Sequence, residues 1–179
     1  MPRESAVIMI AARRVAAASL LILVAAAGHA APTPPPKLVV VLVVDQMRAD
    51  YVQRYGFQWT GGLRRLVDGG AWFSRAAYPY LSTVTCVGHA TVSTGAFPRT
   101  HGIVGNSWFD RDLGRSIGCS ADDAATTISY AAPASGGHGP SRLASATLAD
   151  ELRSQLPVPA RVVTMSIKER TAITLAGRR

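Results

Sequence analysis

The most constraining feature of the sequence is an unbroken run of seven apolar residues at positions 38–44, which ends at Asp45. Most residues of the run are β-branched, and this favours a strand over a helix. Since such a strand has no polar face, both of its faces must be covered, as they are in parallel sheets flanked by helices. Sheets of this kind bind ligands beyond the carboxyl ends of their strands, so Asp45 is a candidate site residue.

Strand and helix patterns alternate along the rest of the chain. The sequence predicts helices over residues 61–70, 83–94 and 147–156 and further strands over residues 71–77 and 161–167. The last of these helices opens with a pattern that resembles a capping box, Thr147 with Asp150. Residues 107–142 are rich in Asp, Gly, Ser and Pro, and we expect an irregular excursion there with a short hairpin around Leu113 and Gly114. The alternation predicts an α/β fold with a mostly parallel sheet flanked by helices.

The first 31 residues have the pattern of a signal peptide followed by a spacer. Arginines precede an apolar stretch at positions 15–27, and small residues that suit cleavage follow it. The stretch is shorter than the roughly 20 residues that a membrane span needs. We therefore expect no stable membrane span and a periplasmic or secreted protein, with an uncleaved N-terminal anchor as the alternative.

The composition narrows the class of protein and partner. With 48% hydrophobic residues, the chain is too apolar for a disordered tail. The formal net charge is +8, but the basic residues form no run with interleaved aromatics, so nucleic acid is not an expected partner. The two cysteines, Cys86 and Cys119, would meet an oxidising compartment after export. Their spacing permits a disulfide, and no cysteine cluster of metal-binding type exists.

Polar side chains mark three places where predicted strands end or helices begin. These places hold Asp45, a group of hydroxyl residues that includes Thr85, and the pair Lys168 and Arg170. Because the ends of parallel strands share one edge, these groups could meet around one anion, with phosphate or sulfate as the natural choice. Each group alone also has a structural interpretation, as a turn residue, a helix cap or a solvated surface pair.

Several sequence segments favour the anion site. They are residues 43–48, 80–89, 93–98, 101–106 and 166–173. Together they resemble the alkaline phosphatase superfamily, specifically the branch that holds the nucleotide pyrophosphatase/phosphodiesterases and the bacterial alkaline phosphatases with a threonine nucleophile. The resemblance implies an alkaline-phosphatase-like fold, of which residues 37–179 would be an incomplete, N-terminal part of the catalytic domain.

The resemblance also implies a role for each candidate residue. Asp45 would be a zinc ligand, and Thr85 would be both the nucleophile and a zinc ligand, in a site that holds two zinc ions when complete. Asn106 would bind a non-bridging phosphate oxygen, and Lys168 and Arg170 would contact the transferred phosphoryl group, as in the family's monoesterases. We therefore expect hydrolysis of phosphate monoesters through a phosphothreonine intermediate, with a phosphate ester as the partner.

Two further expectations follow from the resemblance. His89, His101 and Cys86 lie in the matching segments without being ligands or nucleophiles in the family, so we expect packing roles for them. The family's remaining Asp and His ligands lie beyond the Lys-x-Arg segment and have no counterpart in this chain. The chain would then be a truncated portion with too few ligands for a tetrahedral zinc site, and we expect little or no activity from it alone.

Two alternative functions remain open at this point. One is a phosphodiesterase or nucleotide pyrophosphatase of the same superfamily, and the other is a non-catalytic, anion-binding exported protein.

Overall fold

The computed structural model describes residues 36–126, 128, 136–156, 158 and 160–178. The predicted signal peptide and spacer lie outside the described residues. The chain divides into two compact units, residues 1–42 and residues 43–179, and every candidate site residue belongs to the second unit. Within the described residues, no helix has the length and apolar character needed to cross a membrane.

Helix α4 (Thr85–Thr94) is the buried centre of the second unit. Seven of its ten residues are buried, and they are mostly small, so neighbouring elements can approach closely. The helix ends at Gly95, whose φ of 65° is in the left-handed region that glycine adopts without strain. The predicted helix over residues 83–94 is therefore confirmed, and Pro98 begins the next helix, α5 (Pro98–His101).

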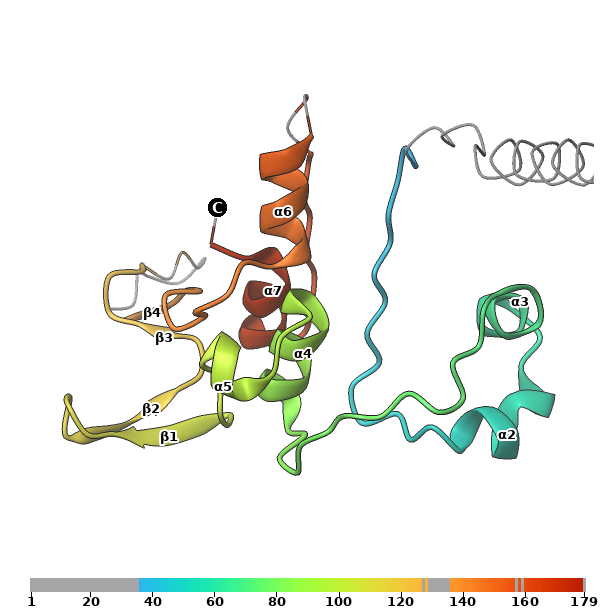
Figure 1. Cartoon of the computed structure of the whole chain (residues 1–179), viewed down its shortest axis with the longest axis horizontal. Helices are drawn as coiled ribbons and strands as arrows, with labels where there is room; N and C mark the ends of the chain where they lie inside the picture. The colour runs from blue at the N-terminus through green and yellow to red at the C-terminus, as the bar shows by residue number, and fades with distance from the viewer. Residues whose placement is uncertain (1–35, 127, 129–135, 157, 159, 179) are drawn as a thin grey trace, which may run out of the picture. The chain divides into compact units, whose positions relative to one another are not determined.

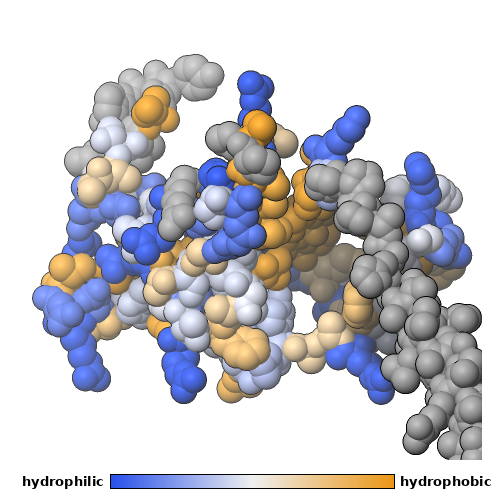
Figure 2. All heavy atoms as spheres, turned by 45° about the horizontal axis from the view of Figure 1, so that its top comes forward, coloured by the Kyte–Doolittle hydropathy of each residue, from blue (hydrophilic) through white to orange (hydrophobic). Residues whose placement is uncertain are grey.

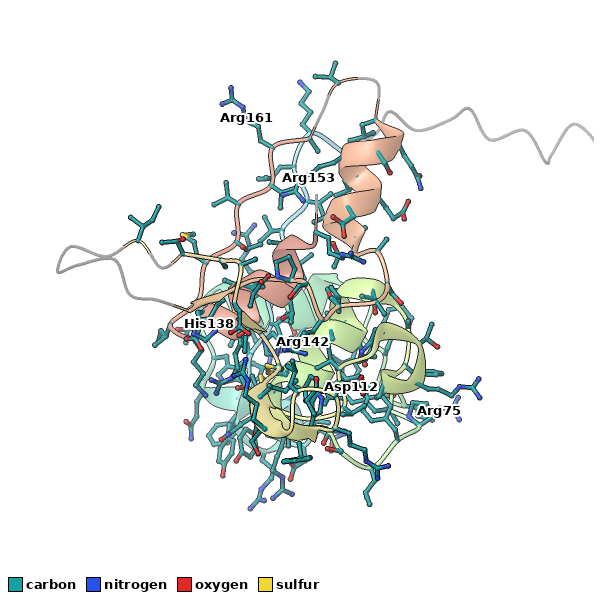
Figure 3. All side chains as sticks on the ribbon, turned by 90° about the vertical axis from the view of Figure 1, so that its left-hand side faces the viewer. Arg75, Asp112, His138, Arg142, Arg153 and Arg161 are labelled. Carbon is teal, nitrogen blue, oxygen red and sulfur yellow. A yellow bond between two sulfur atoms is a disulfide. The ribbon has the colours of Figure 1, made fainter. Side chains whose placement is uncertain are left out.

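Three helices pack against α4 (Figure 1): α5, α6 (Leu148–Gln155) and α7 (Glu169–Ala176). The buried apolar cluster consists of Cys86, Val87, Ala90, Ile103, Cys119 and Leu143, with Tyr80 and Trp108 packed against it. Arg153 of α6 donates a hydrogen bond to the carbonyl of Ala176 at the end of α7 (2.8 Å), so α6 and α7 are also joined directly (Figure 3).

A disulfide joins Cys86, in the first turn of α4, to Cys119, directly after a strand that ends at Gly118. Both residues are buried, and their sulfur atoms are drawn in yellow in Figure 3. The spacing of the two cysteines in the sequence permits this pairing without requiring it, and the structure contains the disulfide. The sequence separation is 33 residues; closing such a loop removes about 3–4 kcal/mol of unfolded-chain entropy.

The expected hairpin is confirmed. Strands β1 (Ser107–Asp110) and β2 (Arg115–Gly118) pair in antiparallel register. The Asp110 carboxylate accepts hydrogen bonds from two backbone N–H groups of the turn, and Gly114 supplies a positive φ of 62°. A second, shorter antiparallel pair consists of β3 (Ala121–Asp122) and β4 (Gly137–His138).

Arg142 links the two antiparallel pairs. Its Nε donates to the carbonyl of Ala121 in β3 (3.1 Å), and its guanidinium lies 3.5 Å from the Asp110 carboxylate at the end of β1. Figure 3 labels this side chain among the strands. The described residues of the region 107–142 are therefore held by specific contacts, although the sequence suggested an irregular excursion there.

Helix α6 begins with the capping box that the sequence predicts. Thr147 Oγ1 accepts from the backbone N–H of Asp150, and the Asp150 carboxylate accepts from the backbone N–H of Thr147. The same carboxylate accepts from the backbone N–H of Arg178, so the cap also fixes the segment after α7. The predicted helix over residues 147–156 is confirmed.

The helix predicted over residues 61–70 is also confirmed, as α3 (Gly62–Gly69), and it follows α2 (Tyr51–Tyr55) and the 3-10 turn η1 (Gly56–Gln58). Its apolar face is open to solvent, since Leu66 is 63% exposed. An ion pair between Arg64 and Asp68, one turn apart, lies on the same helix.

The predicted strands over residues 38–44, 71–77 and 161–167 are not strands in the described part of the chain. A strand needs a hydrogen-bonded neighbour, and these segments have none there: the only ladders among the described residues are the two antiparallel pairs. Most of their large apolar side chains are exposed instead, from 49% at Val44 to 103% at Ile167. Figure 2 shows apolar side chains, in orange, open on the face that it presents.

Candidate active site

Three of the five predicted site residues are linked by contacts through the side chain of Asp45. Thr85 is the first residue of α4, and its Oγ1 donates a hydrogen bond to Oδ2 of Asp45 (3.0 Å). The Lys168 ammonium lies 3.9 Å from the same carboxylate oxygen. Thr85 and Lys168, which are 83 positions apart along the chain, thus lie against the same oxygen of the Asp45 carboxylate.

Asn106 reaches the same helix end from the other side. Its Oδ1 accepts a hydrogen bond from the backbone N–H of Cys86 (2.9 Å). The N-cap residue of α4 is Val84, whose side chain cannot accept, so Asn106 supplies the missing cap from a later loop. A fourth predicted residue therefore lies next to Thr85.

Arg170 is joined to the other four only through the packing of helices. It lies in the first turn of α7, which packs against α4, and its guanidinium is 3.8 Å from the carboxylate of its neighbour Glu169. Its Nε is buried and has no hydrogen-bond partner within the described residues. A buried donor without a partner costs free energy, so this nitrogen is suited to donating a hydrogen bond to an oxygen of an anionic ligand.

The electrostatics of the site favour an anion. The first turn of a ten-residue helix presents the positive end of its dipole. Lys168 adds one positive charge through its contact with Asp45, and Arg170 adds another at the start of α7. Asp45 already pairs with Lys168, and Glu169 lies 3.8 Å from Arg170, so two carboxylates balance the two cations and the helix end supplies the positive potential that an anionic ligand would meet.

Asp45 and Thr85 fit a metal ion as two of its ligands. In a tetrahedral zinc site with ligand distances of about 2.0 Å, two oxygen ligands lie about 3.3 Å apart. The observed separation between Asp45 Oδ2 and Thr85 Oγ1 is 3.0 Å, so both oxygens can face one ion. Among the described residues, no group of three or more His, Cys, Asp or Glu side chains could hold a metal, so these two are a partial ligand set.

The structure adds contacts that sequence reasoning missed. His89 donates from Nδ1 to the carbonyl of Thr85 (2.8 Å), one turn back along α4. His89, His101 and Cys86 are all buried, which agrees with the packing roles expected for them. The helical spacing of Thr85 and His89 was a usable signal for the first contact, whereas no local signal connects Asn106 with Cys86.

Comparison with known proteins decides the family. The family model for type I phosphodiesterase / nucleotide pyrophosphatase matches residues 39–156. The chain belongs to this family. Within it, the chain is 40% identical over 136 residues to the alkaline phosphatase PafA of Elizabethkingia meningoseptica and 39% identical to the alkaline phosphatase PhoV of Synechococcus elongatus. Each alignment covers 75% of this chain but 25% and 24% of the relatives, so the chain spans about a quarter of their length.

Solved structures of this family confirm the fold class. The crystal structure of PafA superimposes with a TM-score of 0.74 and 37% identity over 82% of this chain and 28% of PafA. A substituted form of PafA, with a threonine changed to serine and an asparagine, a lysine and an arginine changed to alanine, gives a TM-score of 0.73. The described chain is thus part of an alkaline-phosphatase-like α/β fold, which explains why its predicted sheet is not formed within it.

Proposed function

We propose that this chain supplies the nucleophile and the phosphate-binding side chains of an exported phosphate monoester hydrolase. In this proposal, residues 37–179 are the N-terminal part of the catalytic domain, after a signal peptide and spacer over residues 1–31. Export agrees with the buried disulfide, which is stable in oxidising compartments.

One observation supports the assignment of the residues above all others. In the substituted form of PafA, the changed threonine, asparagine, lysine and arginine are separated by 21, 62 and 2 positions. Thr85, Asn106, Lys168 and Arg170 are the same residue types with the same three separations. The contacts of Thr85 and Lys168 with Asp45, and of Asn106 with the next residue, Cys86, support the assignment of three of these four positions.

Thr85 is the proposed nucleophile. Its Oγ1 attacks phosphorus as its hydroxyl proton passes to Asp45 Oδ2, the bond to the alcohol oxygen breaks on the opposite side, the alcohol leaves with a proton taken from water, and a phosphothreonine remains. The hydroxide left from that water attacks phosphorus, the bond from Thr85 Oγ1 to phosphorus breaks, inorganic phosphate leaves, and Asp45 returns the proton to Oγ1. Because the Thr85 hydroxyl proton points at Asp45 Oδ2, the lone pairs of Oγ1 point away from the carboxylate and are available for attack.

The other three side chains bind the phosphoryl group. Lys168 supplies a compact positive charge, Arg170 can grip two oxygens, and the NH2 group of Asn106 donates without adding charge. A monoester dianion has three non-bridging oxygens and up to two charges, so it uses both cations more fully than a diester does. The pair Lys168 and Arg170 therefore favours monoesters.

Zinc is the proposed metal, and Asp45 and Thr85 would hold it. A bound zinc ion would favour the ionised form of the Thr85 hydroxyl, which is a weak nucleophile otherwise. Since two ligands are a partial set, this chain alone should bind zinc weakly and turn over substrate slowly, if at all.

A second candidate function is hydrolysis of phosphodiesters or nucleotide pyrophosphates, which is favoured by the family model that matches the chain. A non-catalytic, anion-binding role is the third, and it is favoured by the partial ligand set. Zinc stoichiometry, hydrolysis of a chromogenic monoester, and mass spectrometry for phosphate on Thr85 separate catalysis from binding alone. A Thr85→Val variant should show no phosphorylated peptide.

The first prediction tests the choice between monoesters and diesters by binding. For Lys168→Ala/Arg170→Ala, the affinity for inorganic phosphate should fall by at least about 100-fold, because the variant loses two charge-assisted hydrogen bonds that contribute about 1.5–3 kcal/mol each. Affinity for dimethyl phosphate should change much less. Isothermal titration calorimetry at fixed low salt measures both constants.

The matched control removes the same two residue types elsewhere. Lys37 and Arg75 are both exposed, and neither forms an ion pair or hydrogen bond with a predicted site residue in the described structure. Lys37→Ala/Arg75→Ala lowers the net charge by the same amount and should leave phosphate affinity within about twofold of the wild type. Equal losses of phosphate affinity in the two double variants would contradict the assignment of Lys168 and Arg170 as phosphate-binding residues. Equal losses of phosphate and dimethyl phosphate in Lys168→Ala/Arg170→Ala would favour the diesterase alternative.

A further inference from the structure

We propose that the Cys86–Cys119 disulfide is a positioning device for Asn106 and for the peptide group of the proposed nucleophile. The two half-cystines hold the side chain and the backbone of Asn106, so that the NH2 group of its carboxamide stays the free, donating end beside Thr85. The inference about the disulfide stands on this chain's contacts. That the NH2 group binds a phosphoryl oxygen rests on the proposed function.

The two cysteines and Asn106 form a closed triangle. The backbone N–H of Cys86 donates to Asn106 Oδ1, and the backbone N–H of Cys119 donates to the backbone carbonyl of Asn106, both at 2.9 Å. The disulfide closes the third side. Cys86 is the second residue of α4, Cys119 follows the hairpin, and Asn106 lies between them on the loop that the disulfide closes.

The triangle determines which end of the carboxamide is free. A backbone N–H can only donate, so the group that faces Cys86 must be the oxygen of Asn106, and the NH2 group must be the other end. Asn106 is exposed as a residue, so this donor is open to solvent or ligand. A carboxamide turned by half a revolution would present its oxygen to a phosphate oxygen and repel it.

The same contact fixes the nucleophile's own peptide group. The N–H of Cys86 belongs to the peptide that joins Thr85 to Cys86, and Asn106 accepts from it. The carbonyl of that peptide accepts from His89 Nδ1 (2.8 Å). Both polar atoms of the Thr85–Cys86 peptide are therefore held by side chains, one of which the disulfide keeps in place.

The disulfide is well suited to this role because it is rigidly packed. Cys86 is fully buried and Cys119 is 3% exposed, and both belong to the apolar cluster with Val87, Ile103 and Leu143. A packed interior resists displacement, so the backbone N–H groups of both cysteines keep fixed positions. The Asn106 side chain itself is held to the helix by one hydrogen bond, from the backbone N–H of Cys86, so the cross-link adds a covalent restraint beside it.

The test compares three variants of the whole chain by NMR with uniform 15N labelling: Cys86→Ser/Cys119→Ser, Asn106→Ala and Leu143→Ala. Serine keeps the backbone N–H at both positions and removes only the cross-link. Leu143→Ala removes a buried side chain of the same apolar cluster without touching the triangle, so it controls for lost stability. The readouts are hydrogen exchange at the residue 86 amide and the Asn106 NH2 signals during titration with inorganic phosphate.

In the double serine variant, we expect exchange at residue 86 to speed up by at least about tenfold more than in Leu143→Ala. We also expect phosphate affinity to fall about as much as in Asn106→Ala, roughly three- to tenfold for one hydrogen bond. Adding Asn106→Ala to the double serine variant should then cause little further loss, because both changes remove one interaction. If the double serine variant does not fold, the same signals are followed while the wild-type disulfide is reduced by a phosphine at low temperature.

The two possible failures are distinguishable. If Asn106→Ala weakens phosphate binding while loss of the disulfide alters neither affinity nor exchange beyond Leu143→Ala, the positioning role is overturned and the proposed function stands. If exchange at residue 86 depends on the disulfide while Asn106→Ala leaves phosphate affinity unchanged, the disulfide positions Asn106 and the proposed phosphate contact is overturned.

Discussion

His101 is a fully buried histidine whose hydrogen bonds fix its tautomer. Its Nδ1 accepts from the backbone N–H of Ile103 (3.1 Å), so the ring proton is on Nε2, which lies 3.1 Å from Thr91 Oγ1. The Thr91 hydroxyl in turn bonds the hydroxyl of Tyr80 (2.6 Å). Burial lowers the pKa of His101 below its ordinary value, although its backbone hydrogen bond acts in the opposite direction.

This lowered pKa predicts a loss of stability in acid. Below about pH 6.5 the unfolded chain takes up a proton on His101 before the folded chain does, so the free energy of unfolding falls as pH falls, by up to about 1.36 kcal/mol per unit. The loss ends once the pH is below the folded-state pKa, and above pH 6.5 the contribution is constant. Urea unfolding between pH 4.5 and 8 measures this slope.

Two variants separate His101 from other groups that titrate in this range. His101→Gln should lower the free energy of unfolding at neutral pH but flatten its decline in acid. His138→Gln, at an exposed histidine, should leave the slope as it is in the wild type. An unchanged slope in His101→Gln would contradict the assignment to His101.

At this scale the sequence predicted which side chains would lie together better than it predicted the backbone contacts around them. Asp45, Thr85 and Lys168 were expected to meet, and their side chains do. The contacts of Asn106 with Cys86 and Cys119 were not expected, because they join a loop to a helix end through backbone N–H groups. Any residue other than proline supplies a backbone N–H, so the pattern of side chains in the sequence does not predict these contacts.

At the scale of elements, the hairpin and three helices, α3, α4 and α6, were predicted from the sequence, whereas α2, α5 and α7 were not predicted and the predicted strands are not formed among the described residues. The hydrogen bonds of α3, α4 and α6 are local, so the spacing of apolar residues and the caps suffice to locate them. The hairpin between β1 and β2 is equally local. The run at residues 38–44 has strong strand character, but a ladder needs a distant partner, and among the described residues it has none.

The capping box of α6 gives the prediction at this scale. Thr147 is fully buried, and it bonds Asp150 through both its hydroxyl and its backbone N–H. Thr147→Ala should lower the free energy of unfolding by about 1–2 kcal/mol, because it removes a cap and leaves the Asp150 N–H unsatisfied. Ser154→Ala, at an exposed position of the same helix, should change it by less than about 0.5 kcal/mol.

Urea denaturation followed by circular dichroism measures both changes. Because Asp150 also accepts from the backbone N–H of Arg178, the segment after α7 should loosen together with α6 in Thr147→Ala. Faster hydrogen exchange at Arg178 in this variant, and not in Ser154→Ala, would verify the link. Equal stabilities of the two variants would contradict the role of the cap.

At the scale of the whole molecule, two opposing features govern solution behaviour. Large apolar side chains are open to solvent, among them Val163, Met165 and Ile167, which alternate along one segment and are each at least 79% exposed. Burying such side chains against another surface is favourable by about 1.5–3 kcal/mol each. Against this, a net charge of +8 makes copies of the chain repel one another at low salt.

The balance predicts self-association that grows with salt, since screening weakens the repulsion and leaves apolar burial unopposed. Val163→Lys/Ile167→Lys should weaken the association at least about tenfold, with little change in stability because both side chains are exposed. Ser116→Lys/Thr126→Lys adds the same two charges at exposed polar positions and should weaken it only slightly. Sedimentation velocity over a range of protein concentrations, at low and at high salt, measures each association constant. If the two double variants weakened association equally, net charge and not the apolar segment would control it. A wild-type chain that stays monomeric at high salt would show that these exposed side chains do not drive self-association.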